Sequence, residues 1–137
     1  MKVKEIMSTH VISLSPTDSL RQAARKMSEH NIGSMPVVEN GKLLGIITDR
    51  DISVFAIAMG YGPQSTEVQK IMTTEVITCF NDQELGDAAQ IMQQQHIRRL
   101  AVLDHDNHLE GFLSVDDIAL ASHDLAGAVL EAATPSH

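Results

Sequence analysis

The sequence predicts a mixed α/β fold built from two similar halves, and three observations support this prediction. A shift of 65 positions aligns residues 3–38 with residues 68–103 and gives 12 identical pairs in 36 positions, whereas unrelated segments would share about two or three. Each half has the apolar spacing of an amphipathic helix. Each then continues into two apolar runs around a short polar turn. Two copies are too few for an open solenoid, so we expect one pseudo-symmetric domain with any ligand between its halves.

A long helix is predicted in each half from apolar residues at the spacing i, i+3, i+4 and i+7. In the first half the helix begins after the N-cap candidates Thr17 and Asp18, and in the second half after Asn81 and Asp82. The two apolar stripes are Leu20, Ala23, Ala24 and Met27, and Leu85, Ala88, Ala89 and Met92.

A β-hairpin is predicted after each long helix. The first joins Met35–Glu39 to Leu43–Thr48 through Asn40-Gly41, a turn whose two residues tolerate positive φ. The second joins Leu100–Asp104 to Leu109–Ser114, and one inserted residue lengthens its turn at Asp106–His108. Short strands should precede the long helices at residues 11–13 and 76–78. Further helices should follow the hairpins at residues 50–59 and 116–121. The tail should be helical at Leu125–Ala133 and fray over Thr134–His137.

Composition narrows the class of protein. The chain has 137 residues, enough for one compact core, and its formal charge of -8 gives no general attraction to nucleic acid or to an anionic membrane. No long apolar run or signal-like start is present. The single cysteine, Cys79, excludes an internal disulfide and suits a reducing compartment. We therefore expect a soluble, cytoplasmic protein with no nucleic-acid or membrane partner.

The candidate chemistry lies at the end of one strand in each half. Each of these strands ends in a hydroxyl residue with a carboxylate three positions later: Thr48 with Asp51, and Ser114 with Asp117. A carboxylate can accept two hydrogen bonds from a vicinal diol such as ribose, and the hydroxyl with the free amides of a helix start can receive phosphate. Helix capping boxes have the same spacing, so a purely structural role for both pairs stays open.

Other reactive side chains are expected to be structural. His105, Asp106 and His108 cluster in the inserted turn, but a metal site there would need a third or fourth convergent ligand, so a solvated turn is the preferred interpretation. Cys79 lies in no nucleophile motif and is expected to be a buried small hydrophobe. The methionines that recur at equivalent positions are interpreted as core residues: Met7, Met27, Met72 and Met92. No catalytic residue and no metal site is predicted.

Over residues 3–121 the chain resembles the cystathionine-β-synthase domain family, whose CBS domains occur as tandem pairs. The motifs are the lead Val3–Met7 and its copy Val68–Met72, the segment His30–Val38, and the stretches Gly45–Ile52 and Gly111–Ile118. The resemblance implies two β-α-β-β-α repeats packed as a pseudo-two-fold pair. It divides the chain into repeat 1 (1–61), a linker (62–67), repeat 2 (68–123) and a partly helical tail (124–137).

This family typically binds adenosine-containing ligands in two clefts between the repeats. Carried over to this sequence, the Asp51 cleft comprises Thr48, Asp49, Arg50, Asp51, Lys70, Thr74, Ile77, Ile97, Arg98 and Arg99. The Asp117 cleft comprises Lys4, Thr9, Ile12, Ile32, Gly33, Ser34, Ser114, Val115, Asp116 and Asp117. The second cleft departs from the family pattern at Gly33-Ser34, where a basic pair is often seen. Because the first collects three arginines, we expect it to bind phosphorylated nucleotide more tightly.

The resemblance implies a non-catalytic regulatory module for energy sensing, which binds AMP, ADP or ATP and changes its conformation or its interaction with a protein target. S-adenosylmethionine and NAD are alternative ligands, Mg²⁺ is an optional companion, and no cofactor is required. A homodimer is expected through Ile52, Phe55, Ile57, Ile118 and Leu120. Two other interpretations stay open: a structural dimerisation module with empty or self-filled clefts, and a metal-dependent nucleotide hydrolase using Asp116 and Asp117.

Overall fold

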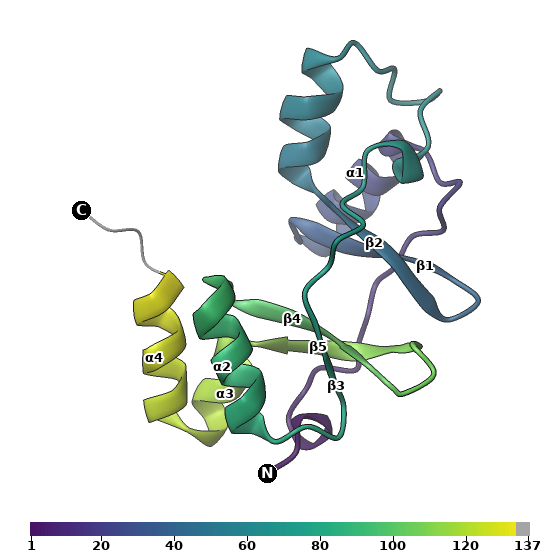
Figure 1. Ribbon diagram of the computed structural model, residues 1–137. Coiled ribbons are helices and arrows are strands. Elements are labelled where there is room, and N and C mark those ends of the chain that lie inside the picture. The colour runs from purple at the N-terminus through teal and green to yellow at the C-terminus, as the bar shows by residue number, and fades with distance from the viewer. Residues whose placement is uncertain (134–137) are drawn as a thin grey trace. The chain divides into compact units, whose positions relative to one another are not determined.

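The computed structural model describes residues 1–133 and confirms the mixed α/β class (Figure 1). Two of its short helices, η1 and η3, are 3-10 helices, and η2 is a π-helix. In chain order the elements are η1 (Val3–Glu5), α1 (Leu20–His30), β1 (Ser34–Glu39), β2 (Lys42–Thr48), η2 (Asp51–Ala56), η3 (Val68–Lys70), β3 (Thr78–Phe80), α2 (Leu85–Gln95), β4 (Arg99–Leu103), β5 (Leu109–Ser114), α3 (Val115–Ala121) and α4 (His123–Ala133). The predicted fraying of Thr134–His137 lies outside the described residues.

The chain forms two compact units, each of which contains the lead of the other sequence repeat. The first-repeat unit is Ile12–Val76, and the second-repeat unit is Met1–Val11 together with the chain from Ile77 onward. Val3 of the first lead is fully buried in the core of the second-repeat unit, and Val68 of the second lead is fully buried in the core of the first-repeat unit. Each lead therefore packs into the core formed by the other repeat.

Backbone hydrogen bonds hold each lead in place. In the second-repeat unit the amides of Val3 and Lys4 donate to the carbonyls of Gln83 and Asn81, both at 2.9 Å, and Ser8 pairs with Phe112 of β5 as an antiparallel bridge. In the first-repeat unit Thr73 forms the equivalent bridge with Ile46 of β2, and both of its hydrogen bonds are 2.9 Å long. The leads thus extend the edges of the two hairpins at equivalent positions.

The two sheets differ in the strand that precedes the long helix. In the second-repeat unit β3 pairs in parallel with β4, which pairs antiparallel with β5. In the first-repeat unit β1 and β2 form a two-stranded antiparallel sheet, and only Leu14 bridges to Val37 in parallel. The predicted strand at residues 11–13 is therefore wrong, and the one at residues 76–78 forms two residues later. The type of hairpin turn was predicted correctly, since Asn40 and Gly41 both have positive φ, 53° and 79°.

Both long helices begin later than the cap candidates in the sequence. Ser19 caps α1, because its hydroxyl accepts from the Gln22 amide at 3.1 Å while the Gln22 side chain accepts from the Ser19 amide at 2.7 Å. Asp18 instead accepts from the amide of Ser15 and closes the preceding turn. Glu84 is the N-cap residue of α2. The cap candidates were residue types that are common at N-caps. The apolar residues of each helix, which must pack against the core, instead determine where its first turn begins.

The C-terminal helix α4 makes the two units unequal. In Figure 1 it lies beside α2, and the ring Nδ1 of His96 at the end of α2 lies 2.8 Å from the carbonyl oxygen of Ala132. Ala89 of α2 is fully buried, but its counterpart Ala24 of α1 is exposed. The predicted apolar stripe of α1 is therefore wrong at Ala24. Within its unit α2 packs against α4, which has no counterpart in residues 12–76.

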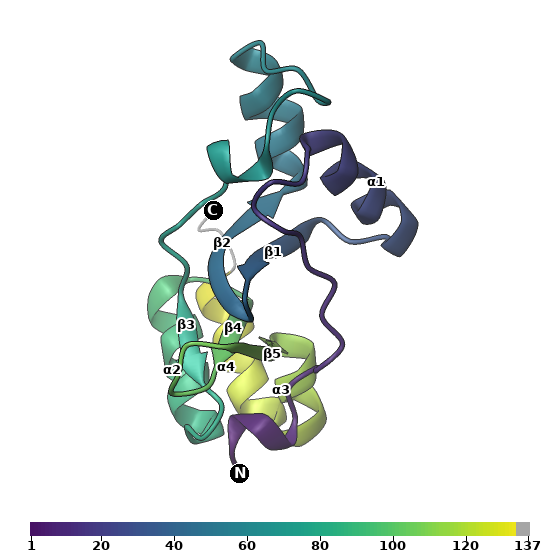
Figure 2. The ribbon, with the colours of Figure 1, turned by 90° about the vertical axis from the view of Figure 1, so that its right-hand side faces the viewer.

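The helices that follow the hairpins also differ. The predicted helix at residues 50–59 contains the π-helix η2. Its counterpart α3, which Figure 2 labels, is α-helical. Phe55, Ile57 and Leu120, which the sequence analysis assigned to self-association, are exposed to 48%, 73% and 90%. Ile118 is fully buried inside its own unit and cannot serve that role without unfolding. Across residues 1–133, no helix combines the length and the apolar character needed to cross a membrane.

Docking of the first lead should depend on pH through Glu84. Its carboxylate accepts from the Lys2 ammonium at 2.9 Å and pairs with the N-terminal ammonium at 3.2 Å, and these contacts lower the pKa of Glu84 and raise that of Lys2. A carboxylate with a lowered pKa stabilises the fold above its ordinary pKa and loses this contribution as the pH falls through the lowered value. The lysine contribution is instead lost as the pH rises through its raised pKa.

We therefore expect Glu84→Gln to lower the thermal midpoint slightly near neutral pH, and expect this difference from the unchanged chain to disappear as the pH falls through the lowered pKa of Glu84. Lys2→Met should give a smaller loss at neutral pH, because the N-terminal ammonium still pairs with Glu84, and the double variant should lose no more than Glu84→Gln alone. A difference that stays constant with pH would contradict the assignment.

Candidate functional site

The Thr48–Asp51 corner joins β2 to η2 in the first-repeat unit. The Thr48 amide donates to Oδ2 of Asp51 at 2.9 Å, and the Asp51 amide donates to Oγ1 of Thr48 at 3.1 Å. Both residues are half-buried. The capping-box interpretation therefore holds for this pair. The capping box uses only Oδ2 of the Asp51 carboxylate. The other oxygen, Oδ1, makes no hydrogen bond within residues 1–133 and stays available to a ligand.

The Ser114–Asp117 corner repeats this geometry in the second-repeat unit. The Ser114 amide donates to Oδ2 of Asp117 at 2.9 Å, and the Asp117 amide donates to the Ser114 hydroxyl at 3.1 Å. The two acids thus have the same orientation relative to their own strand and helix. A capping box does not exclude a ligand, because a carboxylate has about four lone-pair positions and the cap uses one of them.

Near the first corner the structure brings Asp49 next to Gly33, which the sequence analysis assigned to the Asp117 cleft, while Lys70 and Thr74 belong to the same unit. The Asp49 amide donates to the carbonyl of Gly33 at 2.9 Å, and a methyl group at Gly33 would lie 3.1 Å from the Asp49 carboxylate. The Lys70 ammonium lies 4.4 Å from the centre of the Tyr61 ring. Thr74 follows the residue that bridges to β2. A side chain at position 33 would therefore need the exposed carboxylate of Asp49 to move by a few tenths of an ångström.

Around the second corner the charges are arranged differently. Arg99 pairs in register with Ser114, and its guanidinium lies 4.3 Å over the Phe112 ring. Burial lowers the pKa of Arg99, and the nearby negative charge of Asp117 opposes this change. At the equivalent position of the first-repeat unit, Ser34 pairs with Thr48. A cation therefore accompanies Asp117 within its own unit, where the first corner has a serine.

Each predicted cleft combines residues of both units. For the Asp51 cleft, Thr48–Asp51, Lys70 and Thr74 are in the first-repeat unit, and Ile77, Ile97, Arg98 and Arg99 are in the second. For the Asp117 cleft, Lys4, Thr9 and Ser114–Asp117 are in the second-repeat unit, and Ile12, Ile32, Gly33 and Ser34 are in the first. Ile12, Ile32 and Ile97 pack partly against the cores, and Ile77 is 39% exposed.

Sequence reasoning missed that Arg99 accompanies Asp117 and stacks on Phe112. The signal was present, because an antiparallel hairpin places the start of its first strand opposite the end of its second. Arg99 and Ser114 are the first and last residues of these strands. Cys79 is buried as predicted, and burial raises the pKa of its thiol to about 11. The thiol therefore remains protonated at neutral pH and is a poor nucleophile.

Comparison with known proteins identifies the class of protein that this fold represents. The family model described as "CBS domain" matches residues 3–56 and again residues 68–124. The chain is 41% identical over 130 residues to the CBS domain-containing protein YhcV of Bacillus subtilis, covering 93% of this chain and 91% of that protein. It is 36% identical over 119 residues to the uncharacterised protein MK0525 of Methanopyrus kandleri, covering 86% of this chain and 61% of that protein.

Two solved structures extend the comparison. The CBS domain pair of protein MJ0100, in complex with 5-methylthioadenosine and S-adenosyl-L-methionine, has a TM-score of 0.72 and 32% identity, covering 88% of this chain and 94% of that one. CBSX2 in complex with AMP has a TM-score of 0.76 but 24% identity, covering 90% of this chain and 97% of that one, and therefore supports the fold alone. The chain belongs to the CBS domain family and contains a tandem pair of these domains.

Proposed function

We propose that this chain is a non-catalytic regulatory module that binds an adenosine-containing ligand of the AMP, ADP or ATP class through Asp51 and Asp117. The observation that carries the proposal is the duplicated corner, in which a half-buried carboxylate keeps one oxygen outside its capping box. Such an oxygen suits the two adjacent hydroxyls of ribose. The adenosyl ligands of the related MJ0100 pair support the same chemistry.

Phosphate recognition is the second part of the proposal. Arg50 lies two residues after the end of β2, and the family resemblance assigns Arg98 and Arg99 to the same ligand. Guanidinium groups form charge-assisted and often bidentate hydrogen bonds with phosphate. We therefore expect the phosphorylated ligand at Asp51 to be the more tightly bound one. The position of Arg99 beside Asp117 instead favours tighter binding at Asp117. A comparison of the two sites therefore tests the expected order.

A regulatory role requires that the ligand distinguish two states of the protein. Occupancy shifts a conformational equilibrium only by the difference in affinity for the two states. We propose that the response is a change in conformation or in the contact with a protein target, and that the chain works as a cytoplasmic homodimer. The proposed self-association surface comprises Ile52 and Phe55 of η2, Ile57 directly after it, and Leu120 on α3.

Thermal shift should separate this function from a structural dimerisation role. A ligand at about 100 times its dissociation constant adds about 2.7 kcal/mol to the apparent stability. We expect at least one of AMP, ADP, ATP, S-adenosylmethionine and NADH to raise the midpoint, with guanosine monophosphate as the matched control. No shift with any adenosine compound would favour the structural role. Release of phosphate from ATP with Mg²⁺, lost in Asp116→Asn, would instead favour the hydrolase alternative.

A further inference from the structure

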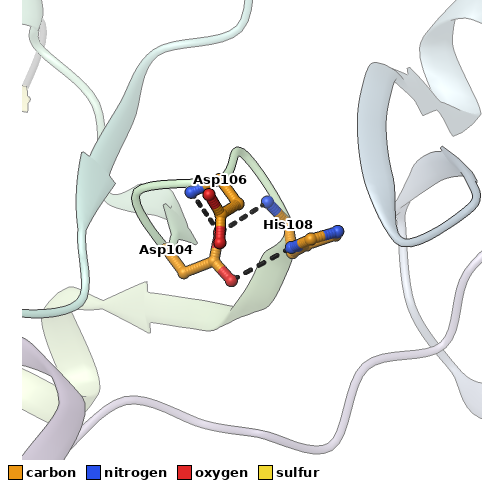
Figure 3. Close-up of side chains that lie close together, drawn as sticks. All are labelled: Asp104, Asp106 and His108. Atoms are coloured by element: carbon orange, nitrogen blue, oxygen red, sulfur yellow. Dashed lines mark hydrogen bonds and ion pairs between the residues drawn. The ribbon is translucent and has the colours of Figure 1, made fainter.

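The β4–β5 turn, residues 104–108, gathers side chains that the proposed nucleotide sites do not use (Figure 3). It is the turn lengthened by the insertion in the second repeat, and its counterpart is the tight Asn40-Gly41 turn. Asn107 has a left-handed φ of 66°, which turns the chain so that His108 faces back toward Asp104. The first-repeat unit has no equivalent group of side chains at its own turn, where Asn40 and Gly41 stand.

Asp104 is the centre of this turn. Its Oδ1 accepts from the amides of Asp106 and His108 at 2.8 and 2.9 Å, and its Oδ2 lies 3.1 Å from the ring Nδ1 of His108 (Figure 3). One ligand atom from each of Asp104, Asp106 and His108 lies within 4.8 Å of the others. The backbone contacts fix Asp104 from one side, so that Oδ2 is the oxygen that faces the imidazole.

The structure corrects the composition of this cluster. The sequence analysis grouped His105 with Asp106 and His108 and asked for a further convergent ligand. His105 instead points away: its Nε2 lies 2.7 Å from Oδ2 of Asp82, and its ring stacks on Phe80 with the ring centres 4.5 Å apart. Asp104 takes its place and supplies the third convergent donor. His105 holds the turn against the neighbouring segment from outside the cluster.

We propose that Asp104, Asp106 and His108 bind one divalent transition-metal ion, with Zn²⁺ as the expected occupant. Imidazole nitrogen with carboxylate oxygen suits zinc and its first-row neighbours, whereas Mg²⁺ and Ca²⁺ prefer sites made of oxygen alone. Two ligands about 2.1 Å from a tetrahedral ion are about 3.4 Å apart, close to the separation of Oδ2 and Nδ1. The ion would displace the proton shared by these two atoms into solvent, and water would complete the coordination.

The Asp106 carboxylate needs the largest adjustment. It is exposed and free to change rotamer, so its movement into the coordination shell meets little steric resistance. Because all three donors come from one short turn, the site should form without any change in the cores of the two units. A bound ion would crosslink the start and the end of the turn and reduce its local opening.

Zinc titration of the full chain tests the proposal without any nucleotide. The probe is ZnCl₂, followed by calorimetry and by NMR of the histidine rings, with MgCl₂ and CaCl₂ as competing probes. We expect binding of Zn²⁺ with a shift of the His108 ring signals and little effect of the other two ions. His108→Gln and Asp106→Asn should each weaken this site by about tenfold or more. His105→Gln is the matched control from the same turn and should change the affinity by less than about twofold.

Three results would overturn the proposal: no zinc-dependent shift of the His108 ring in the unchanged chain, equal affinity in His108→Gln, or an equal loss in His105→Gln. The ring signals of the unchanged chain decide the question even if a variant folds poorly. Neither readout involves the ligands of Asp51 and Asp117. A failure of the nucleotide proposal would therefore leave this test intact.

Discussion

Asp51→Asn is expected to weaken AMP binding by about tenfold to a hundredfold, the effect of losing a charge-assisted hydrogen bond. Asparagine keeps an oxygen that can accept from the Thr48 amide, so the capping box should survive while the charge is lost. Alanine would remove the cap as well and cost about 1 kcal/mol of stability, which would confuse the two roles. Isothermal titration of the asparagine variant measures the binding loss, and its thermal midpoint should stay near that of the unchanged chain.

Asp117→Asn is the internal comparison for this experiment, because its capping box has the same distances. We expect a smaller loss than for Asp51→Asn. Asp87→Asn is the control, since Asp87 is an exposed acid in the first turn of α2, away from both strand ends. Equal losses, or a larger loss at Asp117, would contradict the ranking and would indicate that Arg99 acts together with Asp117. A loss in Asp87→Asn would point to a general effect of charge.

Gly111→Ala is expected to destabilise the protein by about 1–3 kcal/mol, toward the upper end of the range for overpacking. Gly111 lies in β5 where the first lead crosses it, and a methyl group would fall on the carbonyl oxygen of Ser8. That oxygen belongs to the backbone and accepts from the Phe112 amide, so it cannot move aside without breaking the bridge. A methyl group at Gly45 would lie 2.7 Å from the carbonyl oxygen of Thr73, so Gly45→Ala should behave similarly.

Gly86→Ala supplies the matched control for this prediction. Gly86 lies within α2, and a methyl group there meets no atom within 4 Å. Alanine should therefore stabilise the helix by about 0.5–1 kcal/mol. Chemical denaturation measures both variants, and hydrogen exchange at the Ser8 amide shows whether the lead has left β5. A Gly111→Ala protein as stable as Gly86→Ala would contradict the docking of the lead.

Local patterns predicted the helices and hairpins because their signals lie within a few residues. The stripe from Leu85 to Met92 and the Asn40-Gly41 turn depend on helical period and turn chemistry alone. The same holds for the two corners, whose capping spacing was recognised in advance. These features needed no knowledge of which segments pack together.

The features that were missed depend on contacts between distant segments. Ala24 and Ala89 are the same residue in the same motif, but Ala89 is buried in a helix that packs against α4, whereas Ala24 is exposed. The exchange of leads places Val3 and Val68 in cores that no local pattern connects to them. Asp104 joined the turn cluster because backbone amides hold its carboxylate there, and spacing alone favoured His105 instead.

Chemical-shift mapping with AMP tests the central claim most directly. If Asp51 and Asp117 hold the ligand, AMP should shift the backbone amides of Thr48, Asp51, Ser114 and Asp117, which form the two capping boxes. The exposed face of α1, including Arg21 and Arg25, should remain unchanged. Saturable binding of AMP that leaves the amides at both strand ends unshifted would contradict the account.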